Sequence, residues 1–510
     1  MKRKGIIAAG HVETARAGQS ILEAGGNAFD AALGAMLTSF VAEPSLTSLG
    51  GGGFMTAYTS RGQAGLFDFF VQTPLHRRPV EEMDFVESHI NFGTTTQKQF
   101  IGKGSVAVPG CPAGLFHIHQ KLGYMPIQEI AWPAIELAKK GHRVTSYQEY
   151  TVRILEPVLF YTKESQRIYA PNGHLTKEGD IVYRPDFAET LEWICEEGVR
   201  VFYDGELGRK FAQDNAESGG SVSLEDLKAY QVIEREPIKL NYRDHILITN
   251  PPPSEGGSMI SFGLALVNEL FPNELNLPPN GPEYISMLAA VMSGMDLFRH
   301  HHLPISEIRS SEILEFLDPA FVKPFKSKVD LLGNTTHISV LDAEGNAASI
   351  TTTLGGSSGC VIPGTGIPTN NMLGELDLNP RGFYKWDENV RQTSMMSPTI
   401  VIKDGRPEIV TGSGGSSRIR TAILQVLLNL IDHKMPIHEA VSYPRVHWES
   451  HLLNIEPDLV DDQFHLPKSE LKFWDDKHMF FGGVHTVVSE RGFLDRFADV
   501  RRDGAVKRVN

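Results

Sequence analysis

The stretch from Asn334 to Thr353 alternates hydrophobic and polar positions. Ile338 and Val340 are flanked by polar residues, which predicts a half-buried strand. The acidic residues that follow contain a Gly-Asn pair, which is typical of a tight turn. Small and β-branched residues over 347–353 then predict a second strand, so the whole stretch is expected to form a hairpin.

The register of this hairpin follows from the position of its turn. If the turn centres on Glu344, Thr335 lies opposite Thr353. Cross-strand partners lie about 5 Å apart, so the two hydroxyls are close enough for a hydrogen bond. A plain core hairpin with threonines at its rim has the same pattern, and the hairpin alone therefore indicates no function.

The rest of the pattern predicts mixed helices and strands. Residues 11–42 have helical periodicity, with Gly25-Gly26 ending a first helix and Asn27 capping a second. A run of glycines then leads into a strand. Helices are expected again over 106–137 and over most of 140–330, a region to which we assign a scaffold role.

A loop rich in glycine and serine, residues 410–418, precedes an amphipathic helix. The apolar positions of this helix follow the i, i+3, i+4, i+7 spacing and are Ile419, Ala422, Ile423, Val426, Leu427, Leu430 and Ile431. Glycine gives the loop backbone freedom and serine caps the helix. Free amides at such a helix start can bind an oxyanion or a carboxylate, although an ordinary serine-capped helix has the same pattern.

Composition excludes several classes of protein. The chain has 510 residues, which is long for one core, and its 41% hydrophobic and 22% charged residues are those of a globular protein. A net charge of −14 argues against nucleic acid or an anionic membrane surface as the main partner. Cys111, Cys195 and Cys360 are too few and too widely spaced for a disulfide framework or a zinc site, and they suit a reducing compartment.

The N-terminus carries basic residues, but no signal-peptide apolar core follows it, and no apolar run reaches membrane-spanning length. We therefore expect a cytoplasmic protein, or else an exported one whose leader was trimmed.

Several motifs together resemble the gamma-glutamyltransferases, also called gamma-glutamyltranspeptidases, of the N-terminal nucleophile hydrolase superfamily. Asn334-Thr335-Thr336-His337, before a Ser-Val-Leu-Asp strand and a Gly-Asn turn, resembles the autocleavage site of that family. The glycine-rich residues 48–55, Val106–Leu115 and Pro251–Gly257 also resemble family segments. The resemblance implies an α/β fold, a four-layer α/β/β/α sandwich in which two stacked sheets are flanked by helices.

On this resemblance, the chain cuts its own Asn334–Thr335 bond. The products are a large subunit, residues 1–334, and a small subunit, residues 335–510, which together form a heterodimer. The Thr335 hydroxyl becomes the nucleophile and its new α-amine the base, because an unperturbed α-amine titrates at about pH 8.

The resemblance also assigns the remaining catalytic roles. Thr353 orients the nucleophile, and the amides of Gly415 and Ser416 hold the oxyanion, although the family more often has Gly at both positions. Neither a metal nor an organic cofactor is expected, since nucleophile, base and oxyanion donors suffice for acyl transfer.

The substrate-binding positions are only partly retained. Glu375 stands where the family has an Asp that holds the substrate α-amine, and Ser394 remains of a serine pair that contacts the α-carboxylate. The alternative interpretation of Glu375 is an ordinary acidic side chain that is exposed to solvent on a loop. The loop over 376–393 is shorter than the lid of many family members, which implies a more open site.

Three departures affect the carboxylate clamp. Phe70 replaces the Arg that grips the α-carboxylate, Gly355 replaces a substrate-binding Asn, and Met395 replaces the second Ser. An Arg fork suits a carboxylate and Phe does not. Arg77, Arg78 or Arg391 could bind the carboxylate from another direction.

The predicted reaction is hydrolysis or transfer of the acyl group of γ-glutamyl amides such as glutathione, with water or an amine as acceptor. Two alternatives stay open: an acylase for related acyl amides, as in the cephalosporin acylases of the family, and a catalytically silent homologue that binds a ligand. The match of Gly355–Gly359 to a serine-hydrolase elbow is interpreted as accidental, because Pro363 follows too soon for a long helix.

Overall fold

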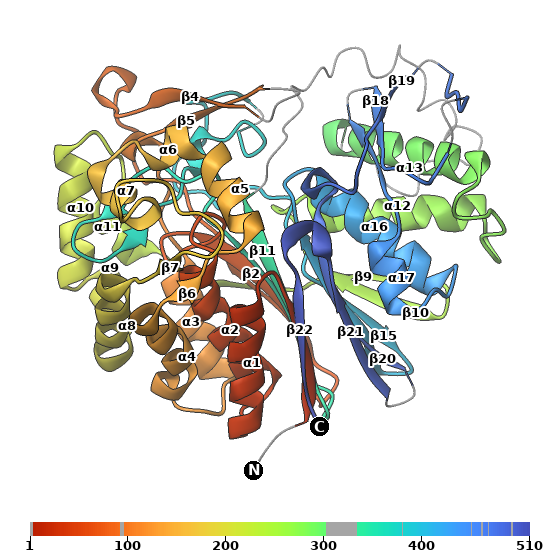
Figure 1. Cartoon of the computed structure of the whole chain (residues 1–510), viewed down its shortest axis with the longest axis horizontal. Coiled ribbons are helices and arrows are strands. Elements are labelled where there is room, and N and C mark those ends of the chain that lie inside the picture. The colour runs from red at the N-terminus through yellow and green to blue at the C-terminus, as the bar shows by residue number, and fades with distance from the viewer. Residues whose placement is uncertain are drawn as a thin grey trace.

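Two stacked β-sheets fill the centre of the computed structural model, and helices cover the outer face of each sheet (Figure 1). The structure describes residues 4–91, 96–301, 334–379, 381–449, 451–460, 463–467, 469–490 and 493–510. The predicted four-layer α/β/β/α sandwich is confirmed. The first and last strands pair with each other, so residues 5–9 lie beside residues 505–509.

The first sheet has seven antiparallel strands and contains the predicted hairpin at its centre. Their order across the sheet is β22 (Ala505–Val509), β1 (Gly5–Ala9), β11 (Thr335–Asp342), β12 (Ala347–Thr353), β2 (Gly52–Tyr58), β3 (Ala64–Phe69) and β8 (Ile233–Arg235). The hairpin β11–β12 thus lies between β1 and β2, so segments from both sides of the Asn334–Thr335 bond build one sheet.

The second sheet has six antiparallel strands. Their order is β21 (Phe493–Ala498), β20 (Gly483–Glu490), β16 (Arg406–Gly414), β15 (Thr399–Lys403), β10 (His245–Thr249) and β9 (Ile238–Tyr242). Strand β16 ends in the glycine- and serine-rich loop, and its last residues lie against the start of β11.

Helices α1 (Val12–Ala24) and α2 (Ala28–Ala42) pack on the first sheet at β1, β11 and β12. The predicted boundary between them is confirmed. Gly25 ends α1 in the left-handed conformation, with φ of 101°, and Asn27 forms a capping box with Asp30 at the start of α2. Helices α3 (Cys111–Leu122), α4 (Ile127–Lys140) and α8 (Pro185–Glu197) complete this layer.

The opposite layer consists of α12 (Gly256–Leu270), α13 (Pro282–His301), α16 (Arg418–Ile431) and α17 (Ile437–Ser442). The apolar stripe predicted for α16 is buried except for Leu430, which is half-buried. The polar face of α16 is buried as well, which the amphipathic pattern did not predict. It packs against neighbouring elements, where Arg420 pairs with Asp296 of α13 at 2.5 Å and Gln425 donates to the carbonyl of Val446.

The region assigned a scaffold role is mostly helical where the structure describes it, and residues 302–333 of that prediction lie outside the described residues. Its further helices are α5 (Ser146–Ile154), α6 (Glu156–Leu159), α7 (Lys163–Tyr169), α9 (Arg200–Tyr203), α10 (Glu206–Glu217) and α11 (Leu224–Ala229). It also supplies β8, β9 and β10, so it contributes edge strands to both sheets.

Short strands make small satellite sheets around this frame. They are β4 (Val86–Asn91), β5 (Thr96–Ile101), β6 (His142–Arg143), β7 (Ile181–Val182), β13 (Val361–Ile362), β14 (Ile367–Pro368), β17 (Val446–Glu449), β18 (Leu452–Ile455) and β19 (Glu470–Phe473).

The two large sheets meet through a layer that is polar near its centre. Ser339 and Ser349 donate hydrogen bonds of 2.9 and 2.8 Å to carbonyls of the second sheet. The prediction of a half-buried strand was wrong in this respect, since every residue of β11 and β12 is buried. Their polar side chains find partners on the facing sheet, as buried polar groups must.

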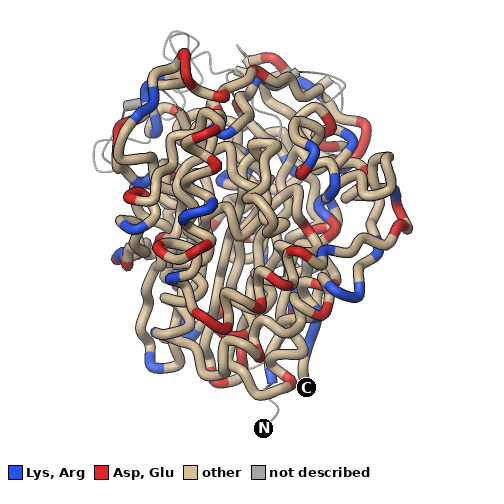
Figure 2. Tube along the Cα trace, turned by 90° about the vertical axis from the view of Figure 1, so that its left-hand side faces the viewer, with Lys and Arg blue, Asp and Glu red and all other residues tan. Residues whose placement is uncertain are grey.

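Apolar residues on the outer faces of the sheets form the two main cores. Ile338, Val340 and Ile350 pack with α1–α4, and Val401 and Ile409 pack with α12, α13 and α16. Figure 2 shows the charged residues mostly at the periphery of the molecule, while the strands in the middle of the view are mostly tan.

Candidate active site

The predicted register of the central hairpin is confirmed. Thr335 of β11 pairs with Thr353 of β12, and both residues are about 95% buried, with exposed fractions of 5% and 6%. The hydrogen bond expected between the two hydroxyls is not the one formed. The Thr353 hydroxyl donates to the carbonyl oxygen of Asn334 and accepts a hydrogen bond of 2.9 Å from the Gly355 amide.

This hydrogen bond forms because the buried carbonyl of Asn334 needs a donor, and the Thr353 hydroxyl provides one. The Thr335 hydroxyl makes no hydrogen bond to any residue that the structure describes. It therefore stays free to approach a carbonyl carbon.

The end of β16 lies directly against Thr335. A Cβ atom on Gly414 would lie 2.2 Å from the Thr335 carbonyl oxygen, so only glycine allows this approach. Gly415 and Ser416 follow with φ values of 136° and 52°. Their carbonyls accept hydrogen bonds of 3.1 Å from the amides of Arg418 and Ile419, as part of the start of α16.

The amides of Gly415 and Ser416 have no acceptor within the described parts of the chain. Two N–H groups at a helix N-terminus, next to a buried hydroxyl, can stabilise an oxyanion. The predicted serine cap is not formed by Ser417, whose hydroxyl accepts instead from the Arg418 guanidinium at 3.0 Å.

His337, two residues from Thr335, is not a general base. Its Nδ1 lies 2.8 Å from the Thr351 hydroxyl and its Nε2 lies 2.9 Å from the Ser339 hydroxyl. Complete burial lowers the pKa of His337 well below its usual value, so the ring is neutral and held in place.

Glu375 lies beside the turn that follows β12 and is not a solvated loop acid. It accepts a hydrogen bond of 2.5 Å from the Gly356 amide. Burial and, to a smaller extent, the nearby Asp377 together raise the pKa of Glu375 to about 7, against the opposite effect of this hydrogen bond. A Cβ atom on Gly355, whose φ is 70°, would lie 2.5 Å from the Glu375 carboxylate. Gly355 therefore lets Glu375 approach and brings no side chain of its own.

Two amide side chains that the sequence analysis did not single out border Glu375. The Asn371 amide group donates to Gln99 Oε1 and to the Phe100 carbonyl, both at 3.4 Å. Gln99 Nε2 and Asn371 Oδ1 are buried and have no partner among the described residues. Asn371 follows Asn370 and lies four residues before Glu375, so its place in the sequence could have marked it, whereas nothing in the sequence around Gln99 does.

The three changed clamp positions lie as follows. Phe70 is fully buried and stacks on Phe54, with ring centroids 5.3 Å apart. Met395 is buried in the core below α12. Gly355 lies at the turn described above. Ser394 is 4% exposed, and its hydroxyl accepts a hydrogen bond of 3.1 Å from the Met396 amide.

The three arginines considered as replacements bind backbone carbonyls. Arg391 donates to the Phe70 and Gln231 carbonyls and lies 3.5 Å from the Asp68 carboxylate. Arg77 donates to the Tyr384 carbonyl, and Arg78 donates to the carbonyls of Ala216 and Gly220. Their guanidinium groups therefore have structural partners.

The loop over 376–393 is tied to its surroundings near its middle and at its start. Trp386 is buried in the core, and Phe383 and Tyr384 pack against Phe85 and Phe100. At the start of the loop, the Asp377 carboxylate accepts a hydrogen bond of 2.6 Å from the Ser416 hydroxyl.

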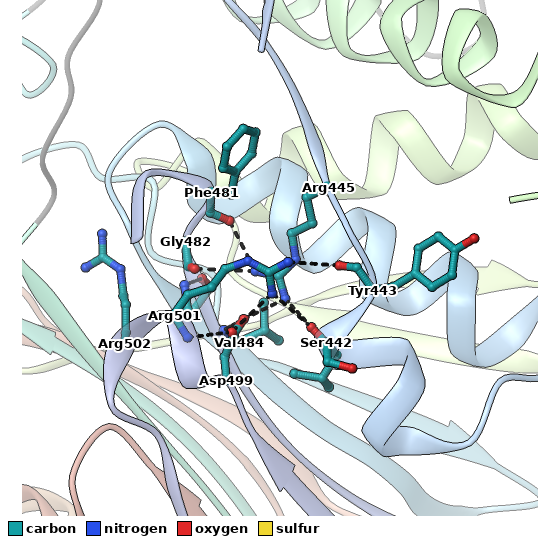
Figure 3. Close-up of polar contacts among 12 residues, drawn as sticks. Ser442, Tyr443, Arg445, Phe481, Gly482, Val484, Asp499, Arg501 and Arg502 are labelled. Carbon is teal, nitrogen blue, oxygen red and sulfur yellow. Dashed lines mark hydrogen bonds and ion pairs between the residues drawn. The ribbon is translucent and has the colours of Figure 1, made fainter. Parts of the chain in front are cut away.

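A buried ionic cluster of Arg445, Asp499 and Arg501, drawn in Figure 3, lies next to Gly482, the residue against which Gly415 packs. Arg445 and Arg501 converge on Asp499, with contacts of 2.6 and 3.2 Å. Burial alone would raise the pKa of Asp499, but the two arginines lower it to about 2. Arg445 also donates to the carbonyls of Phe481 and Gly482, and Gly482 Cα lies 3.0 Å from the place a Cβ on Gly415 would take.

The cysteines are buried and free. Burial raises the thiol pKa of Cys195 and Cys360 to about 12, which makes these thiols poor nucleophiles. In the described ranges, no group of three or more His, Cys, Asp or Glu is arranged to hold a metal ion. No helix in the part of the chain that the structure covers is long and apolar enough to cross a membrane.

The chain is similar to several known proteins. A family model described as Gamma-glutamyltranspeptidase matches residues 14–509. A glutathione hydrolase proenzyme of Pseudomonas aeruginosa is 31% identical over 469 residues, which cover 87% of this chain and 82% of that protein. An acylase ACY 1 proenzyme of Pseudomonas sp. is 29% identical over 471 residues, which cover 89% of this chain and 84% of that protein.

Among solved structures, the cephalosporin acylase from Bacillus halodurans has the same fold. The TM-score is 0.83 at 24% identity, over 99% of this chain and 96% of that chain.

Proposed function

Because the chain belongs to the gamma-glutamyltranspeptidase family, we propose that it is an N-terminal nucleophile enzyme that cuts its own Asn334–Thr335 bond and then cleaves amides through a Thr335 acyl-enzyme. One observation carries the proposal. Thr335, with a free hydroxyl, lies between Thr353 and a loop that leaves the amides of Gly415 and Ser416 without acceptors.

Self-cleavage begins with attack of the Thr335 hydroxyl on the Asn334 carbonyl carbon. The negative charge develops on the carbonyl oxygen that already accepts from Thr353. The C–N bond then breaks, the hydroxyl proton passes to the departing nitrogen, and an ester joins Asn334 to the Thr335 oxygen. Water hydrolyses this ester to give the Asn334 carboxylate and a Thr335 with a free amine.

The mature site uses the same oxygen as nucleophile. The Thr335 amine takes the hydroxyl proton while the oxygen attacks the substrate amide carbon. The amides of Gly415 and Ser416 hold the resulting oxyanion, and the leaving amine takes the proton. The acyl-enzyme ester passes its acyl group to water or to an amine acceptor.

The substrate class we propose is γ-glutamyl amides such as glutathione. Glu375 supports this class, because its carboxylate lies beside the hairpin end and can bind an α-ammonium group. The names of the curated relatives, glutathione hydrolase and acylase proenzymes, are compatible with it. The mature protein would be a heterodimer of residues 1–334 and 335–510, and its cytoplasmic location stays a prediction.

A second candidate is an acylase for related acyl amides without an α-carboxylate. The surroundings of Phe70 favour this acylase. Phe70 is stacked in the core and the guanidinium of Arg391 is bound to backbone carbonyls, so neither side chain is placed to bind an α-carboxylate. The two candidate functions differ only in the acyl group of the substrate, because both use Thr335 as the nucleophile in the same way.

The test is the state of the purified protein and its Thr335 variants. Wild type should separate into two chains on a denaturing gel, with the smaller beginning at Thr335, and should release the amine from an acyl anilide. Thr335→Ala should stay whole and inactive, and Thr335→Ser should keep both properties in weaker form. An uncut and inactive wild type would support the silent homologue instead.

A further inference from the structure

Ser416 adopts a left-handed backbone conformation, with φ of 52°, that a residue with a side chain disfavours. Its hydroxyl donates a hydrogen bond of 2.6 Å to the Asp377 carboxylate. We propose that Asp377 is a positioning residue that holds Ser416 in this conformation and so keeps the amides of Gly415 and Ser416 aimed at the oxyanion. This inference rests on the proposed function.

The conformation of Ser416 decides where its amide and that of Gly415 point. Both carbonyls of the pair are turned into the start of α16, where they accept from the amides of Arg418 and Ile419. A trans peptide points its C=O and N–H in opposite directions, so the Gly415 carbonyl, turned into the helix, leaves the Ser416 N–H on the side away from the helix. If Ser416 relaxed to an ordinary conformation with α16 in place, the peptide between Gly415 and Ser416 would rotate and this N–H would turn away.

Asp377 is itself held in place, as a positioning residue must be. The guanidinium of Arg299, on α13, donates to the Asp377 carbonyl at 3.3 Å. The same guanidinium forms an ion pair of 2.6 Å with Glu255, whose amide donates to the Ser394 carbonyl at 2.8 Å. Asp377 is thus anchored to the segment that carries Ser394.

The other side of the loop has a separate support. Gly415 packs against Gly482, which the ionic cluster around Arg445 holds (Figure 3). The loop therefore has a rigid neighbour at Gly415 and, counting only residues that the structure describes, a single side-chain hydrogen bond at Ser416. Loss of that hydrogen bond should disturb the loop without unfolding its surroundings.

Asp377 lies two residues after Glu375, which borders the proposed acyl site. The proposal predicts that Asp377 acts on the rate of the chemical step and not on substrate affinity. A side chain that bound the substrate directly would instead change KM.

The experiment uses the full-length, self-cleaved protein and an acyl anilide without an ammonium group that wild type hydrolyses. Glu375 has no ammonium to bind in this substrate, so the effect of the Asp377 charge on the pKa of Glu375 does not enter KM. Ser416→Ala removes the hydrogen bond but keeps the backbone strain, and kcat should fall about tenfold to a hundredfold with a smaller change in KM. Ser416→Gly also removes the hydrogen bond but adopts the left-handed conformation freely, so kcat should fall clearly less than in Ser416→Ala.

Variants of Asp377 complete the test. Asp377→Ala should match Ser416→Ala, and Asp377→Asn should stay near wild type because it keeps an acceptor. Asp377→Ala added to Ser416→Gly should have no further effect, since the hydrogen bond is already absent. Thermal melting checks that each variant is folded.

The proposal is overturned by a wild-type kcat in both alanine variants, by a Ser416→Gly variant as slow as Ser416→Ala, or by an Asp377→Ala variant that changes only KM. Failure of the proposed function is recognised separately. The proposed function fails if wild type does not cleave itself or if Thr335→Ala is active. Neither result depends on the variants at 377 and 416.

Discussion

The Thr353 hydroxyl donates a hydrogen bond to the carbonyl oxygen of Asn334, the residue before Thr335. In the uncut chain this donor lies where charge develops during attack on the Asn334–Thr335 bond. Once the bond is broken, the carbonyl is no longer attached to Thr335, and the Thr353 hydroxyl can turn toward the nucleophile opposite it. One hydroxyl would therefore act twice, first in self-cleavage and then in turnover.

Replacement of Thr353 by Val should slow self-cleavage about a hundredfold, because it keeps the shape of the side chain and removes the donor. The time course of the two chains on a denaturing gel measures this rate. Thr353→Ser keeps a hydroxyl and should cleave much faster than Thr353→Val. Cleavage of Thr353→Val at the wild-type rate, followed by unchanged turnover, would refute both roles.

Phe70 and Met395 stand where the family has an Arg and a Ser that bind the α-carboxylate. The protein should therefore discriminate only weakly between substrates with and without a free α-carboxylate, since each charge-assisted hydrogen bond of such a clamp contributes roughly 1.5–3 kcal/mol. The comparison is kcat/KM for a γ-glutamyl anilide, its α-amide analogue and a glutaryl anilide that lacks the amine. We expect similar values for the first two, with weak activity on glutathione. A strong preference for the free carboxylate would show a clamp built from other residues.

The pH dependence of KM should report on Glu375. Its pKa is raised to about 7, so the carboxylate is mostly protonated at pH 6 and ionised at pH 8. An α-ammonium group needs the ionised form, and KM for a γ-glutamyl anilide should fall as the pH rises through about 7. Glu375→Gln should remove this dependence, as should the glutaryl anilide, which has no ammonium. A KM that falls equally for both substrates would contradict the assignment.

Glu43 should make the folded protein less stable at higher pH. It is 3% exposed, accepts hydrogen bonds from Thr14 and Thr336 at 2.7 and 2.6 Å, and has a pKa raised by burial from 4.5 to about 7. Because the folded state binds the proton more tightly, this stabilisation is present below pH 4.5 and is lost as the pH rises through about 7.

The shift in pKa corresponds to about 3 kcal/mol of stability lost between these limits. Glu43→Gln cannot ionise, so its stability should depend less on pH than that of wild type. Urea unfolding at pH 5 and pH 8 measures both proteins. Equal pH dependence in the two would show that Glu43 does not ionise in this range.

Much of the central geometry could be predicted from the sequence, because it depends on local rules. The short turn around Glu344 and the two-residue period of a strand fix the pairing of Thr335 with Thr353. Gly25 and Asn27 mark the boundary of two helices by their backbone and capping chemistry. These features need no knowledge of distant segments.

The residues that the sequence analysis missed depend on distant segments. Gln99 reaches Asn371 from another strand, and Arg299 reaches Asp377 from the end of a long helix. No spacing rule relates such pairs. The hydrogen bond of Thr353 was mispredicted for another reason, since a register gives the distance between residues but not the direction of a neighbouring carbonyl.

The place of β11 and β12 in the sheet has a consequence for assembly. They pair with β1 on one side and with β2 on the other, and β1 and β2 both precede residue 334. Cleavage at Asn334–Thr335 would break the chain but leave the sheet continuous. The two products would be joined by strand pairing and not by contact between two separate surfaces. The products should not separate on dilution, because departure of the hairpin would break hydrogen-bond ladders on both sides. Two chains synthesised separately would have to complete one sheet while folding, so mixing them after each has folded should not restore the protein.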